Sequence, residues 1–334
     1  MPLFYSLLLT SILAYGVSVL GQTYSIKDLG TLGGSFSQAN AINATGQIVG
    51  TSGTTGTPGG AFIYSGGKMT NLGTLGGSSS AAYGINNSGS VVGYSTISSG
   101  YYRAFLWQKG KMKDLGTLGA NYAAAFAVNA SGQVVGSSYT RANLEHAFLY
   151  SAGKMTDLGT LGGEYSAAHG INRFGSVVGY AYKANGGFHA FFYDAGTMHD
   201  LGTLGGAYST ANAINDSGQI TGQGYTPGNL GAHAFLYNSG KMTDLGVLND
   251  VYSEGGAINT FGMVVGRASI KNNTGYLVYH AVIYSNGKAI DLNRLVPAGS
   301  GWILEQATGI NDTGQIVGFG KIHGQNHGFL LTPQ

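Results

Sequence analysis

Six pairs of a basic residue and an aspartate are the most regular chemical feature of this sequence. Five of the pairs are eleven residues apart and the sixth joins the two ends of the chain: Arg103 with Asp114, His146 with Asp157, His189 with Asp200, His233 with Asp244, His280 with Asp291, and His327 with Asp28. A histidine beside a carboxylate can act in general acid–base catalysis. Six pairs spread through 334 residues cannot converge on one substrate, however. We therefore expect the pairs to be structural and predict no catalytic residue among them.

Five acidic residues outside these pairs support an alternative function. They are Glu145, Glu164, Asp250, Glu254 and Glu305. Two carboxyl groups about 5 to 10 Å apart would serve as the acid and the base of a glycoside hydrolase or lyase. Acidic residues in loops are more often solvated surface groups, so we favour a non-catalytic function and keep the enzyme as the alternative.

The remaining sequence contains no other catalytic or cofactor motif that we recognise. It has no Gly-x-Ser-x-Gly, no His-Glu-x-x-His and no phosphate-binding P-loop. It has no cysteine, which excludes disulfides, cysteine-bound zinc, iron–sulfur clusters and a thiol nucleophile. The net charge is only +2 and 9% of the residues are charged, without a Lys/Arg cluster, which disfavours a nucleic-acid partner. We expect no metal and no cofactor.

The elements that position these residues belong to a repeat of 43 to 47 residues. An Asp-Leu-Gly motif or a close variant begins at Asp28, Asn71, Asp114, Asp157, Asp200, Asp244 and Asp291. An Ile/Val-Asn-x-x-Gly motif, which we interpret as the turn between the first and second strands of each copy, has its turn asparagine at Asn43, Asn86, Asn129, Asn172, Asn215, Asn259 and Asn311. A period of this length with strand signals is typical of the four-stranded blade of a β-propeller. We predict an all-β fold, a seven-bladed β-propeller of four-stranded blades, over residues 22–334.

The four strands of a blade can be assigned in the fourth copy. We predict strands at Ala167–Asn172, Ser176–Tyr180, His189–Tyr193 and Thr197–Leu201. The third and fourth strands are joined by two residues ending in glycine, as at Ala152-Gly153 in the third copy, which favours a type I′ hairpin. That register makes each basic residue the diagonal neighbour of its aspartate.

The two ends of the sequence are predicted to complete one blade. The last copy supplies three strands and ends with His327–Leu331, and its missing fourth strand matches Tyr24–Leu29. Pairing these two segments would close the ring and remove two exposed sheet edges.

The loops that differ most among the copies are predicted to share one face, where function tends to lie. Candidate ligand-binding residues on that face are Phe36, Tyr122, Tyr165, Tyr208 and Tyr252, seven residues before the turn asparagine, Tyr83 and His169, three residues before it, and Trp302, in an insertion of the last copy. Aromatic and neutral polar groups around a channel mouth suit a carbohydrate or a peptide. The alternative is that the aromatic side chains wedge between adjacent blades.

The first 21 residues resemble a secretory signal peptide. Pro2–Leu20 is almost entirely apolar or small, and Val19 and Gly21 fit the small positions before a cleavage site at Gln22. The alternative is an uncleaved membrane anchor, since about 18 apolar residues can span a bilayer. We expect export to the cell surface or the medium, with the periplasm as a further location, and no later segment that spans a membrane.

The repeat as a whole resembles the HAF-repeat family of predicted extracellular bacterial proteins. The His-Ala-Phe of His146–Phe148 and His233–Phe235 carries this resemblance, with the recurring Asp-Leu-Gly-Thr-Leu-Gly-Gly and Ile-Asn-x-x-Gly-Gln-Val-Val-Gly. Gly60, Arg103 and Val282 depart from the pattern. The resemblance implies an exported repeat protein and assigns no catalytic residue. We therefore predict a non-catalytic binding or interaction module for a carbohydrate or peptide; a purely structural envelope protein remains a further alternative, and the oligomeric state is not predicted.

Overall fold

The computed structural model describes residues 22–272 and 274–334, so the predicted export signal, residues 1–21, lies outside the described residues. The described chain consists of β-strands, with two short 3-10 helices, η1 (Pro227–Asn229) and η2 (Leu292–Arg294). No helix in this part of the chain is long and apolar enough to cross a membrane.

Hydrogen bonding groups the strands into five four-stranded sheets and one eight-stranded sheet. One sheet joins both ends of the described chain, in the order β1 (Tyr24–Asp28), β28 (Gln325–Pro333), β27 (Ile316–Ile322) and β26 (Trp302–Ile310). The other four-stranded sheets are β2 (Gly33–Ile42), β3 (Ile48–Thr54), β4 (Thr57–Ser65) and β5 (Lys68–Asn71); β14 (Gly162–Ile171), β15 (Val177–Lys183), β16 (Phe188–Asp194) and β17 (Thr197–Asp200); β18 (Ser209–Ile214), β19 (Ile220–Tyr225), β20 (Ala232–Asn238) and β21 (Lys241–Asp244); and β22 (Ser253–Ile258), β23 (Val264–Lys271), β24 (Leu277–Ser285) and β25 (Lys288–Asp291).

The eight-stranded sheet contains two repeats. Its strands are β6 (Gly76–Ile85), β7 (Val91–Ile97), β8 (Tyr102–Gln108), β9 (Lys111–Asp114), β10 (Gly119–Val128), β11 (Val134–Thr140), β12 (Glu145–Ser151) and β13 (Lys154–Asp157). A single parallel bridge between Tyr102 and Tyr122 joins the two halves. The sequence predicts separate sheets here, and it does not reveal this bridge because the two tyrosines come from different repeats.

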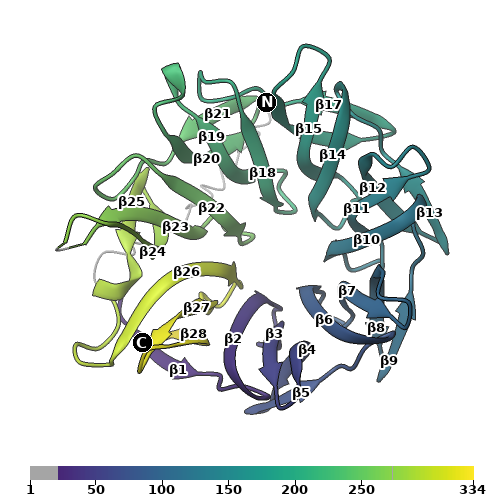
Figure 1. Ribbon diagram of the computed structural model, residues 1–334. Helices are drawn as coiled ribbons and strands as arrows, with labels where there is room; N and C mark the ends of the chain where they lie inside the picture. The colour runs from purple at the N-terminus through teal and green to yellow at the C-terminus, as the bar shows by residue number, and fades with distance from the viewer. Residues whose placement is uncertain (1–21, 273) are drawn as a thin grey trace, which may run out of the picture.

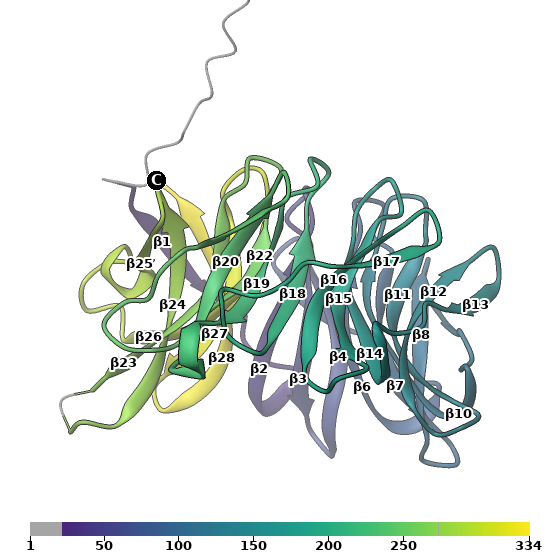
Figure 2. The ribbon, with the colours of Figure 1, turned by 90° about the horizontal axis from the view of Figure 1, so that it is seen from above.

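The sheets are arranged around a common centre, with the first strand of each repeat innermost (Figure 1). These innermost strands are β2, β6, β10, β14, β18, β22 and β26. Seen edge-on, the sheets stand side by side and their connections lie on two opposite faces (Figure 2). Every turn between an innermost strand and the next strand therefore lies at the same end of the central axis.

The predicted hairpins between the third and fourth strands are confirmed. Ala152 and Gly153 have φ values of 49° and 83°, and the corresponding residue pairs of the other hairpins are likewise at positive φ. This is the conformation of a type I′ turn. In the resulting register Phe148 lies opposite Asp157.

The innermost strand of the fourth repeat is longer than predicted. In the fourth repeat the strand covers Gly162–Ile171 instead of Ala167–Asn172. The second strand also continues to Lys183, which pairs with Gly162 across a break in the register. The extension places Tyr122 and Tyr165 within strands β10 and β14, although the sequence predicts that they lie in loops.

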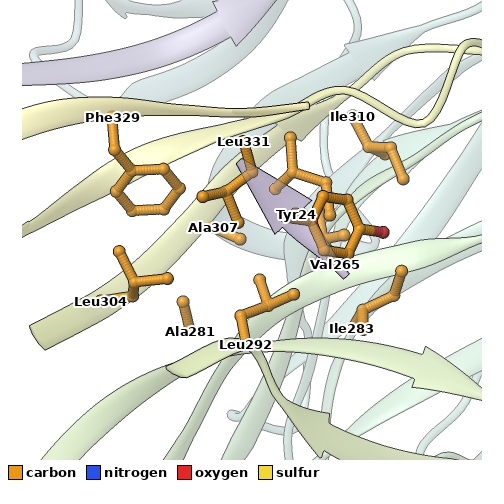
Figure 3. Close-up of a cluster of buried hydrophobic side chains, with 11 residues drawn as sticks. Tyr24, Val265, Ala281, Ile283, Leu292, Leu304, Ala307, Ile310, Phe329 and Leu331 are labelled. Carbon is orange, nitrogen blue, oxygen red and sulfur yellow. The ribbon is translucent and has the colours of Figure 1, made fainter. Parts of the chain in front are cut away.

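The first strand of the described chain pairs with the last. In this antiparallel pair Tyr24 lies opposite Pro333 and Asp28 lies opposite Phe329. Tyr24 is 2% exposed and lies among the apolar side chains of β26 and β28, including Ile310 and Leu331 (Figure 3). The predicted strand pairing is therefore present and is supported by burial of Tyr24.

The apolar core is divided among the contacts between neighbouring sheets. The cluster in Figure 3 combines Val265 and Ile283 of one sheet with Leu304 of the next. An equivalent cluster holds Val317 of β27 against Ile48 and Phe62 of the first repeat. The last and first repeats therefore pack against each other as other neighbours do.

Candidate functional site

One residue of every innermost strand bulges out of the strand ladder. The register against the second strand shifts around Asn40, Tyr83, Phe126, His169, Asn212, Gly256 and Thr308. A bulge leaves its residue outside the ladder and changes the direction of its side chain. The position is the one three residues before the turn asparagine in each repeat.

A glycine in the second strand permits each bulge. In the fourth repeat, a Cβ added to Gly179 would lie 1.9 Å from the carbonyl oxygen of Ala167. Comparable contacts exist at Gly50, Gly93, Gly136, Gly222, Gly266 and Gly318. The Val-Val-Gly end of the repeat motif thus reflects a close approach of two backbones, which only glycine tolerates.

The seven bulged residues line one central cavity of about 450 Å³. Glu254 of β22 and Gln306 of β26 also line it. Each innermost strand runs from a loop between repeats to the turn at its end, and the bulged residue lies before that turn. This axial cavity therefore opens toward the face that carries the loops between repeats. Its size falls within the usual range for sites that bind small molecules.

A second cavity, of about 310 Å³, lies at the turn end of the axis and is lined by the turn asparagines. Ile85, Val128, Ile171 and Ile214 line both cavities, so branched apolar side chains form the floor of the axial cavity. Around this end, turn asparagines donate from Nδ2 to the backbone oxygen of the next one: Asn43 to Asn86 (3.1 Å), Asn86 to Asn129 (2.9 Å), Asn129 to Asn172 (3.1 Å), Asn215 to Asn259 (3.0 Å), Asn259 to Asn311 (3.3 Å) and Asn311 to Asn43 (3.2 Å). The sequence predicts turn geometry for these residues but not these links between repeats.

One side of the axial cavity is aromatic. The ring of Phe126 lies 5.4 Å from that of Tyr83 and 5.7 Å from that of His169, measured between centroids. Tyr94 contacts Tyr83 at 5.9 Å and Tyr180 contacts His169 at 5.6 Å, both from second strands. We call Tyr83, Phe126 and His169 the aromatic side of the cavity.

The opposite side is polar and consists of Asn40, Asn212, Glu254, Gln306 and Thr308. Asn40 Nδ2 donates to the backbone oxygen of Ala82, and Thr308 Oγ1 donates to that of Ala39. Asn212 Nδ2 donates to Glu254 Oε1 and to the backbone oxygen of Gly255, at 3.0 Å each. These contacts hold the side chains of Asn40, Asn212 and Thr308 against the neighbouring repeat.

The ionisable groups of the cavity are neutral or compensated. Burial lowers the pKa of His169, whose Nδ1 lies 3.2 Å from the backbone oxygen of Ala211. Since a carbonyl oxygen only accepts, Nδ1 holds the proton of the neutral ring. Burial also raises the pKa of Tyr83 to about 12. Glu254 Oε2 accepts from Arg267 Nε at 2.9 Å, which balances the one carboxylate at the cavity.

The predicted ligand-binding residues separate into two groups. Tyr83 and His169 line the axial cavity, whereas Phe36, Tyr122, Tyr165, Tyr208, Tyr252 and Trp302 do not. Several of the second group contact the preceding repeat: Tyr122 lies 6.2 Å from Tyr102, and Tyr208 lies 4.9 Å from Phe188. These contacts correspond to the wedging alternative.

The remaining members of that group contact residues of their own repeats, and Tyr252 also forms a parallel backbone bridge with Ala232 of the preceding repeat. Phe36 lies against Gly53, and Tyr165, 39% exposed, contacts Tyr182. Tyr252 donates from its hydroxyl to Glu254, and Trp302 packs its ring 6.0 Å from Phe329. Trp302 is half-buried and packs against the apolar cluster drawn in Figure 3, so it is not exposed to solvent as an isolated aromatic residue.

The six basic–acidic pairs are in contact between the two outer strands of their sheets, five of them at hairpins and the sixth between β28 and β1. Nδ1 of histidine lies 2.7 to 2.9 Å from an aspartate oxygen in His146–Asp157, His189–Asp200, His233–Asp244, His280–Asp291 and His327–Asp28, whereas Arg103 Nε lies 3.8 Å from Asp114 Oδ2. Because a carboxylate only accepts, Nδ1 is the donor in each histidine pair. No pair lines the axial cavity.

Of the five acidic residues that support the enzyme alternative, Glu254 alone lines the axial cavity. Glu305 forms an ion pair with Lys321 at 2.9 Å and lines a separate hollow with Arg267 and Tyr279. Within the described residues, no three His, Asp or Glu side chains are grouped so as to hold a metal ion. The paired carboxylates of a glycosidase are therefore not assembled at this cavity.

No protein-family model matches the chain, and no curated protein matches it. Solved structures match over most of its length. A puromycin hydrolase mutant complexed with PGG is 12% identical, with a TM-score of 0.56, over 87% of this chain and 51% of that chain. A puromycin-hydrolyzing peptidase from Mycobacterium tuberculosis is 13% identical, with a TM-score of 0.53, over 90% of this chain and 49% of that chain. The chain spans about half the length of these two proteins. At this identity the similarity concerns the fold, which is all-β and β-propeller-like.

Proposed function

We propose that residues 22–334 form a closed, seven-bladed β-propeller that serves as a non-catalytic binding or interaction module. The contacts between the last and first repeats support closure. Beyond the pairing of β1 with β28, Asn311 donates to the backbone oxygen of Asn43, and the backbone N–H of Gly328 donates to Ser37 Oγ at 2.9 Å. These are the contacts that neighbouring repeats make elsewhere, as between Ala147 and Ser166.

The axial cavity carries the proposal of a binding function. Each repeat contributes one residue at the same bulged position, and these residues differ in chemistry although the backbone around them is repeated. A rigid scaffold that displays variable side chains around one hollow is suited to binding. The ligand class is a carbohydrate or a peptide, since the wall combines aromatic rings with amides and little net charge.

The proposed setting is outside the cytoplasm, as a member of the HAF-repeat family. Support comes from the repeat motifs and from the apolar residues 1–21. Mass spectrometry of protein recovered from the culture medium or periplasm should find Gln22 as the first residue. A full-length chain retained in the cytoplasm would contradict export.

A binding screen tests the function itself. Residues 22–334 would be labelled and applied to a glycan array and to a peptide array. We expect ligands on one of them, and we expect Tyr83→Ala to weaken their binding about tenfold, a loss of about 1.4 kcal/mol.

Two matched variants locate the site. Phe174→Ala changes a 66%-exposed aromatic residue in the turn at the other end of the axis and should leave binding unchanged. Tyr165→Ala changes an aromatic residue outside the cavity, and an effect from it but not from Tyr83→Ala would place the site away from the axial cavity. Empty arrays, or ligands held equally by Tyr83→Ala, would refute the proposal.

A further inference from the structure

The polar side of the axial cavity offers hydrogen-bond acceptors. Asn40 and Asn212 direct their amide nitrogens at backbone oxygens of the next repeat. This fixes the orientation of the amide, since a carbonyl oxygen only accepts. Asn40 Oδ1 has no hydrogen-bond partner among the described residues, and Glu254 Oε1 accepts one bond, from Asn212. A ligand there has to donate hydrogen bonds.

Gln306 adds a side-chain amide whose oxygen and nitrogen are both available for hydrogen bonds to a ligand. Gln306 lines both the axial cavity and the separate hollow beside Arg267, and its side chain makes no hydrogen bond to another described residue. It can both donate and accept, as a ligand with hydroxyl groups requires. The aromatic side faces these acceptors across the cavity, and the floor beneath is aliphatic. A ligand must therefore combine donors on one edge with apolar C–H surface on the other.

The charged groups on the cavity wall restrict the class of ligand further. Glu254 is already paired with Arg267 at 2.9 Å, and His169 is held against a backbone oxygen. A charged ligand would lose hydration without finding an opposite charge on the wall. A peptide terminus or an acidic sugar therefore fits poorly.

We propose that the axial cavity binds a neutral saccharide, with an apolar sugar face against Tyr83 and Phe126 and its hydroxyl groups toward Asn40, Glu254 and Gln306. This inference rests on the proposed binding function and names its ligand class. The saccharide enters from the loop face, because the branched apolar side chains that form the floor of the cavity offer no hydrogen-bond partner to a hydroxyl group.

The test compares ligand classes on residues 22–334. Neutral oligosaccharides, acidic oligosaccharides and neutral peptides would be titrated by calorimetry. We expect heat from neutral saccharides alone, with an affinity that stays constant between roughly 0.05 and 0.5 M salt, because no ion pair is screened. Phe126→Ala and Gln306→Leu should each weaken binding about tenfold, which is about 1.4 kcal/mol, and Phe174→Ala should not.

Each of the other outcomes would overturn the ligand class, the site or the binding function. Binding of peptides or acidic sugars that Phe126→Ala abolishes would keep the binding function and overturn the saccharide. Neutral saccharides that bind equally to Phe126→Ala and Gln306→Leu would overturn the site. Binding of none of the three classes would refute both. If Phe126→Ala melts at a lower temperature than the parent chain, Phe126→Leu keeps the apolar volume without the ring and should still weaken saccharide binding.

Discussion

The two oxygens of Asp157 make two separate contacts, which explains why the pair recurs around the molecule. Oδ1 accepts from the backbone N–H of Gly159 at 2.8 Å, and Oδ2 accepts from His146 at 2.8 Å. In the first repeat, Asn71 keeps the first contact, to Gly73 at 2.8 Å, while Gly60 supplies no second partner. The turn contact is thus retained where the charge pair is absent, as expected for a structural role.

The pH dependence of stability provides a test at Asp291. Burial alone would raise the pKa of Asp291, but hydrogen bonds from His280 and Asn293 outweigh it and lower the pKa. The unfolded carboxyl group, with a pKa of about 3.9, takes up its proton at a higher pH than the folded one. The stabilisation is complete above that value and is lost as the pH falls through the folded pKa.

We expect Asp291→Asn to lower the free energy of unfolding by about 1.5 kcal/mol at neutral pH, and by much less near about pH 3. Urea unfolding at both pH values measures the difference. Asp194→Asn, which changes an exposed carboxylate, is the control and should behave as the parent chain does. An equal loss for Asp291→Asn at both pH values would show that its charge does not stabilise the fold.

At the scale of the strands, the outer hairpins and the presence of the innermost strands could be predicted, but the full length of β14 and the bulges could not. Two-residue turns ending in glycine determine the register locally, so the partners of Asp157 and Asp200 follow from sequence spacing. The bulge at His169 depends instead on the contact between the backbones of Gly179 and Ala167. In the sequence, the glycine at the end of Val-Val-Gly indicates only a residue of low strand propensity. It does not indicate which backbone of the innermost strand it contacts. Glu254 and Gln306 were therefore not predicted to line the cavity.

The bulge can be tested by adding one methyl group. Gly179→Ala would place Cβ 1.9 Å from the Ala167 carbonyl oxygen, so the strands must separate. We expect a loss of about 1 to 3 kcal/mol in the free energy of unfolding. Gly59→Ala is the matched control, because its Cβ would lie 3.4 Å from Thr51 Cγ2, an ordinary contact. Equal effects of the two substitutions, measured by urea unfolding, would argue against the bulge.

For the whole molecule, the sequence repeat predicted the partner of the N-terminal strand. It could not predict the bridge between Tyr102 and Tyr122 or the asparagine links, since both depend on how neighbouring sheets meet. The contacts of Tyr122 and Tyr208 with the preceding repeat could not be predicted for the same reason. Tyr122 and Tyr208 repeat because each sheet needs apolar contact with the previous one, and sequence periodicity alone does not separate such contacts from a ligand site.

Removing the first strand tests closure. A chain of residues 30–334 would leave β28 with an unpaired edge and would lose Tyr24 from the core. We expect a lower melting temperature than for residues 22–334, and association at high concentration through the exposed edge. Calorimetry and light scattering measure the two effects. A synthetic peptide of residues 22–29 should restore the melting temperature, and an unchanged melting temperature in its absence would contradict closure.

Gly256 occupies the bulged position of the sixth repeat without offering any side chain, and the bulge is present there all the same. The backbone therefore does not need a particular residue at this place. Selection, or an engineer, can exchange the groups that face the axis one at a time while the sheets stay intact. Related chains with the same architecture could accordingly differ in what they hold, and a library built on these seven positions is a direct route to new specificities.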